Sequence, residues 1–358
     1  MELNERKLAI LKAIVEDYIA TAEPVGSRTL SRKYIPSLSS ATIRNEMSDL
    51  EEMGYLLQPH TSAGRIPSEA AYRLYVDQLM EQQPLSPEEI NQIRQQAWRK
   101  DEQMQTIIRQ TAYIISELTQ YTALVLAPQL RRATLKRIQL VYLSAGMALV
   151  VIVTDTTVVK DSILPIPEGI TEEDLTRISR LLTERFAGHS LTDIDLQTVE
   201  ALQKDLYRNR VFFDSLIRAL NDSILKPDRG RLVLDGAVNI FHYPEYKDID
   251  KARHFLTMLE TRDQLYRMLA KRTKWEYTIT IGDENQEREL RDYSVVTATY
   301  KVGSRPVGSI GVIGPMRMNY PRVVQVLSEA TQSLGEIFSE KNHNIEHRNG
   351  KGEQNEKA

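Results

Sequence analysis

Hydrophobic residues recur at helical spacing along the first part of the chain. The first predicted helix covers residues 4–21, with Asn4 as its N-cap; its apolar face consists of Leu8, Leu11, Val15 and Tyr18, with Ile10 and Ile14 flanking them. A short second helix begins at Ser27 and places Leu30 and Tyr34 one turn apart. Residues 35–38 form a turn, because Pro36 disfavours helical backbone at the residue before it.

A third helix and a short hairpin follow this turn. The third helix begins at Ser39 or Ser40, buries Ile43, Met47 and Leu50 on one stripe, and ends at Gly54. The next residues predict a strand over 55–58, a turn over 59–64 and a return at Arg65 and Ile66, before a fourth helix that extends to about Gln82. Three helices with a tight second connection and a following hairpin predict a winged helix-turn-helix.

The outward face of the third helix carries side chains that can contact DNA. If the apolar stripe is buried, Ala41, Asn45 and Ser48 point away from it. Arginine suits guanine, asparagine suits adenine, and small methyl groups suit thymine. The predicted DNA-binding residues are Ser27, Arg28, Arg32, Lys33, Ser39, Ser40, Ala41, Thr42, Arg44, Asn45, Ser48, His60 and Arg65. A helical bundle or a winged helix that docks protein remains the alternative for this pattern alone.

The rest of the chain alternates between strands and helices. A capping box at Ser86 opens a long helix, strands are predicted at 138–143, 147–153 and 158–164, and helices at about 171–188, 195–207 and 211–225. Then follow a strand at 232–234, a helix at 249–270, strands at 275–281, 293–300 and 307–313, and a helix at 321–339. This order predicts an α+β, GAF-like domain with a mainly helical insertion.

The predicted layout therefore has five parts. They are a winged-helix domain at 1–83, a linker helix at 84–120, a GAF-like domain at 121–165 and 231–340, an inserted dimerisation domain at 166–230, and a disordered tail at 341–358.

Composition narrows the possible functions. The 358 residues contain no cysteine, which excludes disulfides, thiol catalysis and cysteine-ligated metal sites. The chain opens with charged residues instead of an apolar signal segment, so we expect a cytoplasmic protein. The net charge of −3 argues against a general polyanion binder, yet residues 24–45 contain Arg28, Arg32, Lys33 and Arg44 and no acid. A local basic window of this kind indicates directed contact with phosphate.

Candidate catalytic chemistry is sparse. Residues 308–314 lack the glycine spacing of a dinucleotide site, and no phosphate-binding loop or nucleophile elbow appears in the sequence. His242, Glu245 and His254 could seed a metal site, but their spacing matches no strong motif. We therefore expect no enzyme activity, no metal and no cofactor.

Three N-terminal motifs are distinctive in combination: PVGSRTL at 24–30, SSATIRNEMSDLEEMGYL at 39–56 and PHTSAGRIP at 59–67. Together they resemble the HrcA family of bacterial heat-inducible transcription repressors. The segments GAVNIF at 236–241 and GSIGVIGP at 308–315 are similar to the same family, so the resemblance covers nearly all of the chain except the tail.

This resemblance implies a concrete function. Such repressors are homodimers with a winged-helix domain, a GAF-like domain and an inserted dimerising domain. They bind the CIRCE inverted repeat before chaperone operons such as groE and dnaK, and the GroEL chaperonin favours their active form. Heat shock occupies GroEL with unfolded clients, which lowers the amount of active repressor.

Two alternatives stay open from sequence. One is a repressor whose GAF-like domain binds a small metabolite; a ligand that shifts melting temperature or operator affinity would favour it. The other is an enzyme with an accessory winged helix, which would need a convergent acid–base or metal site.

Overall fold

The computed structural model describes residues 3–60, 63–97, 104–128, 134–144, 146–154, 159–167, 169–189, 232–271 and 276–355. The chain divides into two compact units, which are described separately. The first contains residues 1–125, 233–299 and 310–331, and the second contains residues 126–232, 300–309 and 332–358. Mixed helix and sheet in more than one unit confirm the α+β multidomain prediction at this level.

The first unit begins with three helices at the predicted places. They are α1 (Glu5–Thr21), α2 (Ser27–Lys33) and α3 (Ser40–Glu52). Asn4 caps α1 by accepting a hydrogen bond from the Lys7 backbone N–H at 2.9 Å. The buried face of α1 is centred on Ile10, Leu11 and Ile14 instead of on Leu8 and Tyr18, which are half-buried.

A two-stranded hairpin and a fourth helix follow. The hairpin pairs β1 (Leu56–Leu57) with β2 (Ile66–Pro67), and Thr61 and Ser62 of the predicted turn lie outside the described residues. Ser68 caps α4 (Glu69–Leu74), which continues as the single π-helical turn η1 (Tyr75–Leu79). This helix therefore ends before Gln82, the predicted end.

A five-stranded sheet has the order β7-β3-β10-β9-β8. Its strands are β3 (Thr122–Leu126), β7 (Leu232–Asp235), β8 (Tyr277–Ile281), β9 (Tyr293–Val302) and β10 (Arg305–Pro315). Strands β8 and β9 pair antiparallel, with Ile279 opposite Val296. Strand β3 was not predicted, although it lies next to the centre of the sheet and all its residues are buried.

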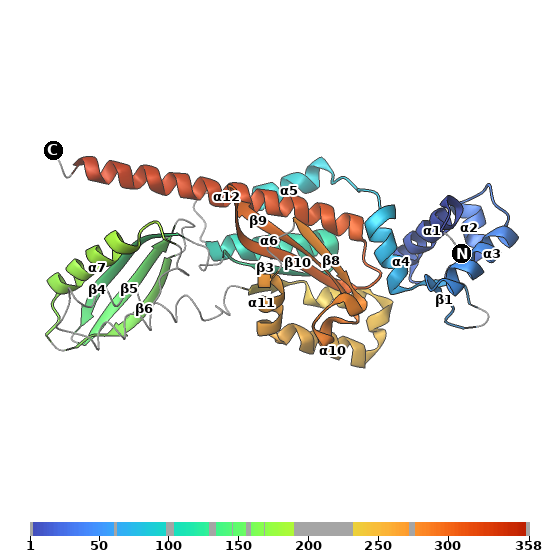
Figure 1. The fold of residues 1–358 in the computed structure, drawn as a ribbon, viewed down its shortest axis with the longest axis horizontal. Helices are drawn as coiled ribbons and strands as arrows, with labels where there is room; N and C mark the ends of the chain where they lie inside the picture. Colours follow the sequence, from blue (N-terminus) through green and yellow to red (C-terminus); the bar gives the residue numbers. More distant parts are fainter. Residues whose placement is uncertain are drawn as a thin grey trace. The chain divides into compact units, whose positions relative to one another are not determined.

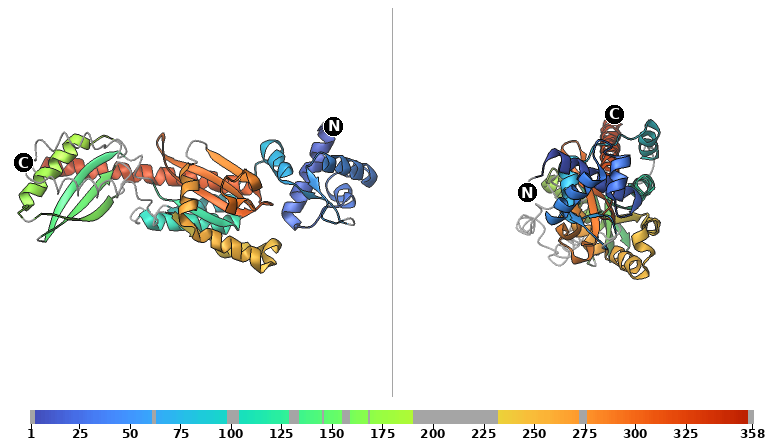
Figure 2. Two further views of the ribbon diagram at one scale, coloured as in Figure 1. Left: turned by 60° about the horizontal axis from the view of Figure 1, so that its bottom comes forward. Right: turned by 90° about the vertical axis from the view of Figure 1, so that its right-hand side faces the viewer.

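Helices cover both faces of this sheet. They are α5 (Pro87–Ala97), α6 (Met104–Thr119), α10 (Ile249–Glu260), α11 (Arg262–Lys271) and α12 (Tyr320–Asn355), with the 3-10 turns η5 (Ala237–His242), η6 (Pro244–Lys247), η7 (Gly282–Glu284) and η8 (Arg288–Leu290). On β9, Tyr293 packs on Phe255 of α10, with ring centroids 5.2 Å apart. The next residue, Ser294, is hydrogen-bonded at 2.7 Å to the Tyr320 hydroxyl of α12. Since successive strand residues point to opposite faces, α10 and α12 lie on opposite sides, and Figure 2 shows α10 and α11 together on one side.

The second unit contains a separate sheet. Strands β4 (Leu135–Ser144), β5 (Met147–Thr154) and β6 (Val159–Pro165) pair antiparallel in chain order, and α7 (Glu172–Phe186) lies beside them (Figure 1). Thr171 caps α7 in a capping box with Asp174. Two hydroxyls of α7 bind the edge strand: Ser179 accepts from the Leu140 N–H at 2.8 Å and Thr183 from the Ile138 N–H at 3.1 Å.

This second sheet corrects one prediction. The sequence placed the strands at 138–164 in the GAF-like domain and began the insertion at 166, whereas the structure gives these strands their own sheet. The physical reason is local: the strands bury Ile138, Leu140 and Ile152 together with the apolar face of α7, so they need no other sheet. The helices predicted at 195–207 and 211–225 lie outside the described residues.

The C-terminal helix is also longer than predicted. Residues 341–358 were expected to be disordered, whereas α12 continues to Asn355. The segment contains no proline, so every residue in it can donate a helical backbone hydrogen bond, although Gly350, Gly352 and four asparagines have low helix propensity. Among the described residues, no helix has the length and apolar character to cross a membrane.

Two ion pairs join α5 to α12. The Arg322 Nη1 donates to Glu89 Oε2 at 3.0 Å, and Arg94 Nε donates to Glu329 Oε1 at 2.8 Å. The hydrogen bond from Arg322, followed by that from the Ser86 backbone N–H, lowers the pKa of the Glu89 carboxyl from 4.5 to about 2. The folded state therefore binds the Glu89 proton less tightly than the unfolded chain.

This pair predicts a pH-dependent stability. A lowered carboxyl pKa stabilises the fold above the unfolded value of 4.5, and this stabilisation is lost as the pH falls toward about 2. The free energy of unfolding of wild type should fall more steeply over this pH range than that of Glu89→Gln. The difference should be less than ~1 kcal/mol, because the ion pair is partly exposed. Urea unfolding between pH 5 and pH 2, with the exposed Glu260→Gln as control, tests this; identical pH profiles for Glu89→Gln and wild type would contradict it.

Candidate nucleic-acid interface

Helix α3 has one buried face and one polar face. Ile43 and Leu50 are fully buried and Met47 is nearly so, as the spacing predicted. The residues on the other side are exposed, namely Ala41, Arg44, Asn45, Ser48 and Glu52. The helix therefore presents an arginine, an amide and small side chains to solvent from its first two turns.

The beginning of α3 is capped by its own side chains. Ser39 Oγ accepts a hydrogen bond from the Thr42 N–H at 3.1 Å and lies 2.8 Å from the Thr42 Oγ1. These two hydroxyls thus stabilise the helix start. The helix dipole and the remaining N–H groups of the first turn, at Ser40 and Ala41, favour an anion such as phosphate at this end.

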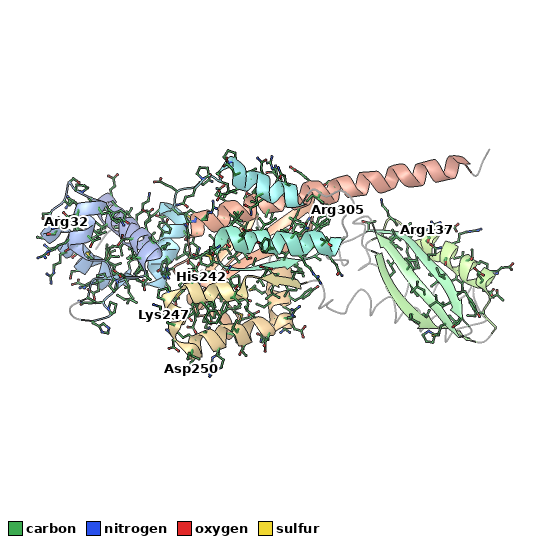
Figure 3. All side chains as sticks on the ribbon, turned by 180° about the vertical axis from the view of Figure 1, so that it is seen from behind. Arg32, Arg137, His242, Lys247, Asp250 and Arg305 are labelled. Atoms are coloured by element: carbon green, nitrogen blue, oxygen red, sulfur yellow. The ribbon has the colours of Figure 1, made fainter. Side chains whose placement is uncertain are left out.

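Helix α2 carries two arginines without a recorded acidic partner. Leu30 is fully buried and holds α2 against α1 and α3, whereas Arg28 and Arg32 are exposed; Figure 3 shows Arg32 at the outer edge of these helices. No ion pair involves Arg28, Arg32 or Arg44 within the part of the chain that the structure describes. Ser27 is half-exposed at the start of α2.

Lys33 is placed differently from these arginines. Its Nζ donates to Asp17 Oδ1 at 2.8 Å, and the Tyr34 hydroxyl donates to the same oxygen at 2.8 Å. The Asp17 side chain is only 7% exposed. The hydrogen bond to Asp17 raises the pKa of Lys33. Because its ammonium group is paired with Asp17, Lys33 helps to hold α2 against α1.

The hairpin is anchored at its base. Val25 and Arg65 exchange two backbone hydrogen bonds of 2.9 Å, and a Cβ on Gly64 would lie 2.4 Å from the Val25 carbonyl oxygen. Only glycine fits this approach. Arg65 Nε donates to Glu51 Oε2 at 2.8 Å, so its guanidinium ties the hairpin to α3. His60 is exposed near the tip.

Helix α3 is also fixed by a buried lysine on α1. The Lys7 Nζ donates to Glu46 Oε2 at 2.6 Å and lies 2.9 Å from Asp49 Oδ2, while its side chain is only 8% exposed. The hydrogen bonds that Lys7 donates to Glu46 and Asp49 raise the pKa of its ammonium group. Both carboxylates lie on α3, so this ion pair sets the rotation of α3 about its own axis.

The predicted site residues therefore separate into groups. Exposed and available side chains are Arg28, Arg32, Ala41, Arg44, Asn45, Ser48 and His60. Lys33 and Arg65 are engaged in ion pairs, Ser39 and Thr42 cap α3, and Ser27 and Ser40 lie half-exposed at helix starts. The sequence analysis missed the supporting acids Asp17, Glu46, Asp49 and Glu51, whose partners are too distant in sequence for any spacing rule to find.

The suggested metal site is not assembled. Glu245 accepts hydrogen bonds from the Arg317 guanidinium, with 3.0 Å between Nη2 and Oε2. Within the described ranges, no group of three histidine or acidic side chains is arranged to hold a metal ion.

Comparisons with known proteins agree along the chain. Residues 105–324 match the family described as HrcA protein C terminal domain. The heat-inducible transcription repressor HrcA of Alkaliphilus metalliredigens is 41% identical over 95% of this chain and 99% of that protein. The repressor of the same name from Desulforamulus reducens is 43% identical over 93% of this chain and 96% of that protein.

A solved structure shares the fold. A crystal structure titled as a hypothetical protein has a TM-score of 0.62 and 23% identity, and covers 95% of this chain and 99% of that chain. The family assignment rests on the sequence identity between this chain and the two repressors, which extends over almost the full length of those proteins. The chain belongs to the HrcA family of heat-inducible transcription repressors.

Proposed function

We propose that this repressor binds the CIRCE inverted repeat as a homodimer and silences chaperone operons such as groE and dnaK. The reading module is a winged helix-turn-helix formed by α1 to α4 and the hairpin β1–β2. The five-stranded sheet with its helices is the GAF-like domain. The GroEL chaperonin maintains the active form, and heat shock removes that support.

One observation carries the proposal: the acid-free basic window of residues 24–45 folds into a surface with three available arginines. Arg28 and Arg32 come from α2 and Arg44 from α3, and all three are exposed. The acids of α1 and α3 are partly used internally, since Asp17, Glu46 and Glu51 each pair with a cation. Residues 1–83 contain 12 Asp and Glu against 9 Lys and Arg, yet they can therefore still offer phosphate a positive face.

The proposed recognition follows from this placement. Helix α3 enters the major groove, where Arg44 can reach guanine O6 and N7 and Asn45 can pair with adenine. Arg28 and Arg32 on α2 contact the backbone phosphates and fix the register. The exposed His60 of the wing reaches the flanking backbone or minor groove.

A two-fold dimer explains why the operator is an inverted repeat. Each protomer presents the same surface, so the two half-sites must be related by the protein's own two-fold axis.

A salt-controlled anisotropy titration tests the function with a CIRCE duplex and a scrambled duplex, each with and without GroEL and ATP. Selective binding that GroEL enhances is expected; equal weak binding to both duplexes in all conditions would refute the proposal.

Arg44→Ala should reduce both affinity and discrimination. If the guanidinium makes a bidentate contact with guanine, its loss costs roughly 1–3 kcal/mol on the operator and relaxes preference at one base step. Random duplex should be affected much less. The measurement is a titration against operators changed at single positions, with Arg253→Ala, an exposed arginine of α10, as the charge-matched control. A similar loss of affinity for operator and random DNA would show that Arg44 does not read a base.

Arg32→Ala should instead weaken binding to every duplex. Loss of one phosphate contact lowers the slope of log affinity against log salt by about 0.9, because one fewer counterion is released. Lys33→Ala should behave differently, since Lys33 also holds α2 through Asp17 and its removal should lower thermal stability too. Salt series on operator and random DNA, combined with melting curves, separate the two roles; an unchanged salt slope in Arg32→Ala would exclude a phosphate contact.

A further inference from the structure

Helix α4 contacts the turn that follows strand β8 through two side chains. Glu69 and Arg73 lie four residues apart, so both project from the same face of α4. Helices α1 to α4 with η1, called the head below, and this turn belong to the same compact unit. The contact therefore joins the reading module to the five-stranded sheet, called the core below.

The acidic member binds backbone. Glu69 Oε2 accepts a hydrogen bond from the Asp283 N–H at 3.1 Å. Gly282 makes room for it: this residue has φ +55°, and a Cβ there would lie 2.2 Å from the Glu69 carboxyl carbon. No other residue type fits at position 282 while the carboxylate stays in place.

The basic member binds a carboxylate and a carbonyl together. Arg73 Nε donates to Glu284 Oε1 at 2.7 Å, and Nη2 donates to the Ile279 carbonyl at 2.8 Å. Nη1 donates to Asp77 Oδ1 of the head at 3.0 Å, which orients the guanidinium. A planar guanidinium engaged on three sides fixes both distance and angle. We call this set, with Glu69, Arg73, Asp283, Glu284 and the Ile279 carbonyl, the α4 clamp.

The turn on the core side of the clamp is held by hydrogen bonds within the core itself. Asn285 is almost fully buried, and its Nδ2 donates to the carbonyls of Gly282, Leu290 and Tyr293 at 2.9–3.0 Å. Glu284 Oε2 accepts from the Ile281 N–H at 2.9 Å. The turn thus holds its acceptor groups without help from the head, which is the arrangement of a preformed docking site.

A second contact restrains rotation about the clamp. Arg317 of the core is 7% exposed, pairs with Glu245, and donates from Nη1 to the Ile19 carbonyl at 2.9 Å. That carbonyl belongs to the last turn of α1, whose acceptors have no partner inside the helix. Between the two contacts, Tyr72 and Tyr320 pack with ring centroids 6.2 Å apart. Two separated attachment points define an orientation that one could not.

The covalent connection alone would not fix the head. Residues 80–86, between η1 and α5, form neither helix nor strand. An extended chain spans about 3.3 Å per residue, so this tether alone would let the head move over roughly 20 Å. Orientation must therefore come from side-chain contacts.

We infer that Glu69 and Arg73 are positioning residues for operator recognition: the α4 clamp fixes α3 on the core and thereby sets the half-site spacing that the repressor accepts. This inference rests on the proposed binding of a homodimer to an inverted repeat. A dimer whose two α3 helices are held rigidly matches one separation between the half-sites. Heads held only by the tether would accept several separations, because the effective concentration of the second head at its half-site then depends only weakly on the spacing.

The test uses the full-length protein and three operator duplexes. The half-sites stand at their native spacing, with about 5 additional base pairs, or with about 10, which rotate one half-site by half a turn or a full turn. The clamp variants are Arg73→Ala, Glu284→Gln and Glu69→Gln. The control is Arg253→Ala, because Arg253 pairs with Asp250 on the exposed face of α10. A duplex with one half-site reports on the reading surface alone.

Release of the clamp should be visible as lost discrimination. Wild type and control should prefer native spacing over the half-turn insertion. In the clamp variants this preference should shrink by roughly tenfold or more, within the range that multivalent linkage provides, while single half-site affinity changes little. General destabilisation would lower half-site affinity instead and leave the preference unchanged.

A second measurement does not involve DNA. Limited proteolysis should cleave the tether at 80–86 faster in the clamp variants than in wild type or control, since a released head lets this already exposed segment adopt the extended conformation that a protease binds more often. Unaltered cleavage, or full spacing preference in Arg73→Ala and Glu284→Gln, would overturn the inference. A wild-type protein that binds the inverted repeat no better than scrambled DNA would instead refute the proposed function, and the spacing role with it.

Discussion

The head depends on two charged side chains of α1 that are buried between its helices, the cation Lys7 and the carboxylate Asp17. Lys7 meets Glu46 and Asp49 of α3, and Asp17 meets Lys33 and Tyr34 at the end of α2. Removing one member of such a pair would leave a charge in a site with little water, which is far more costly than losing an exposed pair. Apolar packing alone would allow α2 and α3 to rotate slightly, whereas these geometries allow a single arrangement.

Internal pairing of the carboxylates explains how a net acidic module can bind DNA. Asp17, Glu46 and Glu51 pair with cations of neighbouring helices or of the hairpin, and three arginines, Arg28, Arg32 and Arg44, form no ion pair in the described structure. Sign and position of charge matter more than the total, because a field close to a surface is dominated by the nearest groups. The net charge of −3 therefore says little about the partner.

Sequence reasoning succeeded where periodicity or a cap determined the local structure. Ile43, Met47 and Leu50 established α3 and its exposed face, and the caps at Asn4 and Ser86 began helices at the observed residues. It failed for β3, because a strand buried on both faces shows no alternation. It also failed to separate β4 to β6 from the other strands, since strand pairing is a long-range choice that local pattern does not encode.

The candidate site was predictable only in part for the same reason. Exposure of Arg44 and Asn45 follows from helical geometry, but the engagement of Lys33 by Asp17 and of Arg65 by Glu51 depends on how distant segments meet. Basic residues within one short window thus take different roles. A basic residue near a reading helix can be a contact or a brace, and only its neighbours in space decide which.

The hydroxyls of α7 have a consequence for behaviour at high temperature. Strand β4 is the edge of its sheet, and the N–H groups of Ile138 and Leu140 are already bound to Thr183 and Ser179, while Leu135 exchanges backbone hydrogen bonds with Gly188 and His189. An edge whose donors are occupied cannot template another chain's strand. Partial opening on warming would therefore have to detach α7 before β4 could pair with another chain, which protects this edge from aggregation under the conditions that call for chaperones.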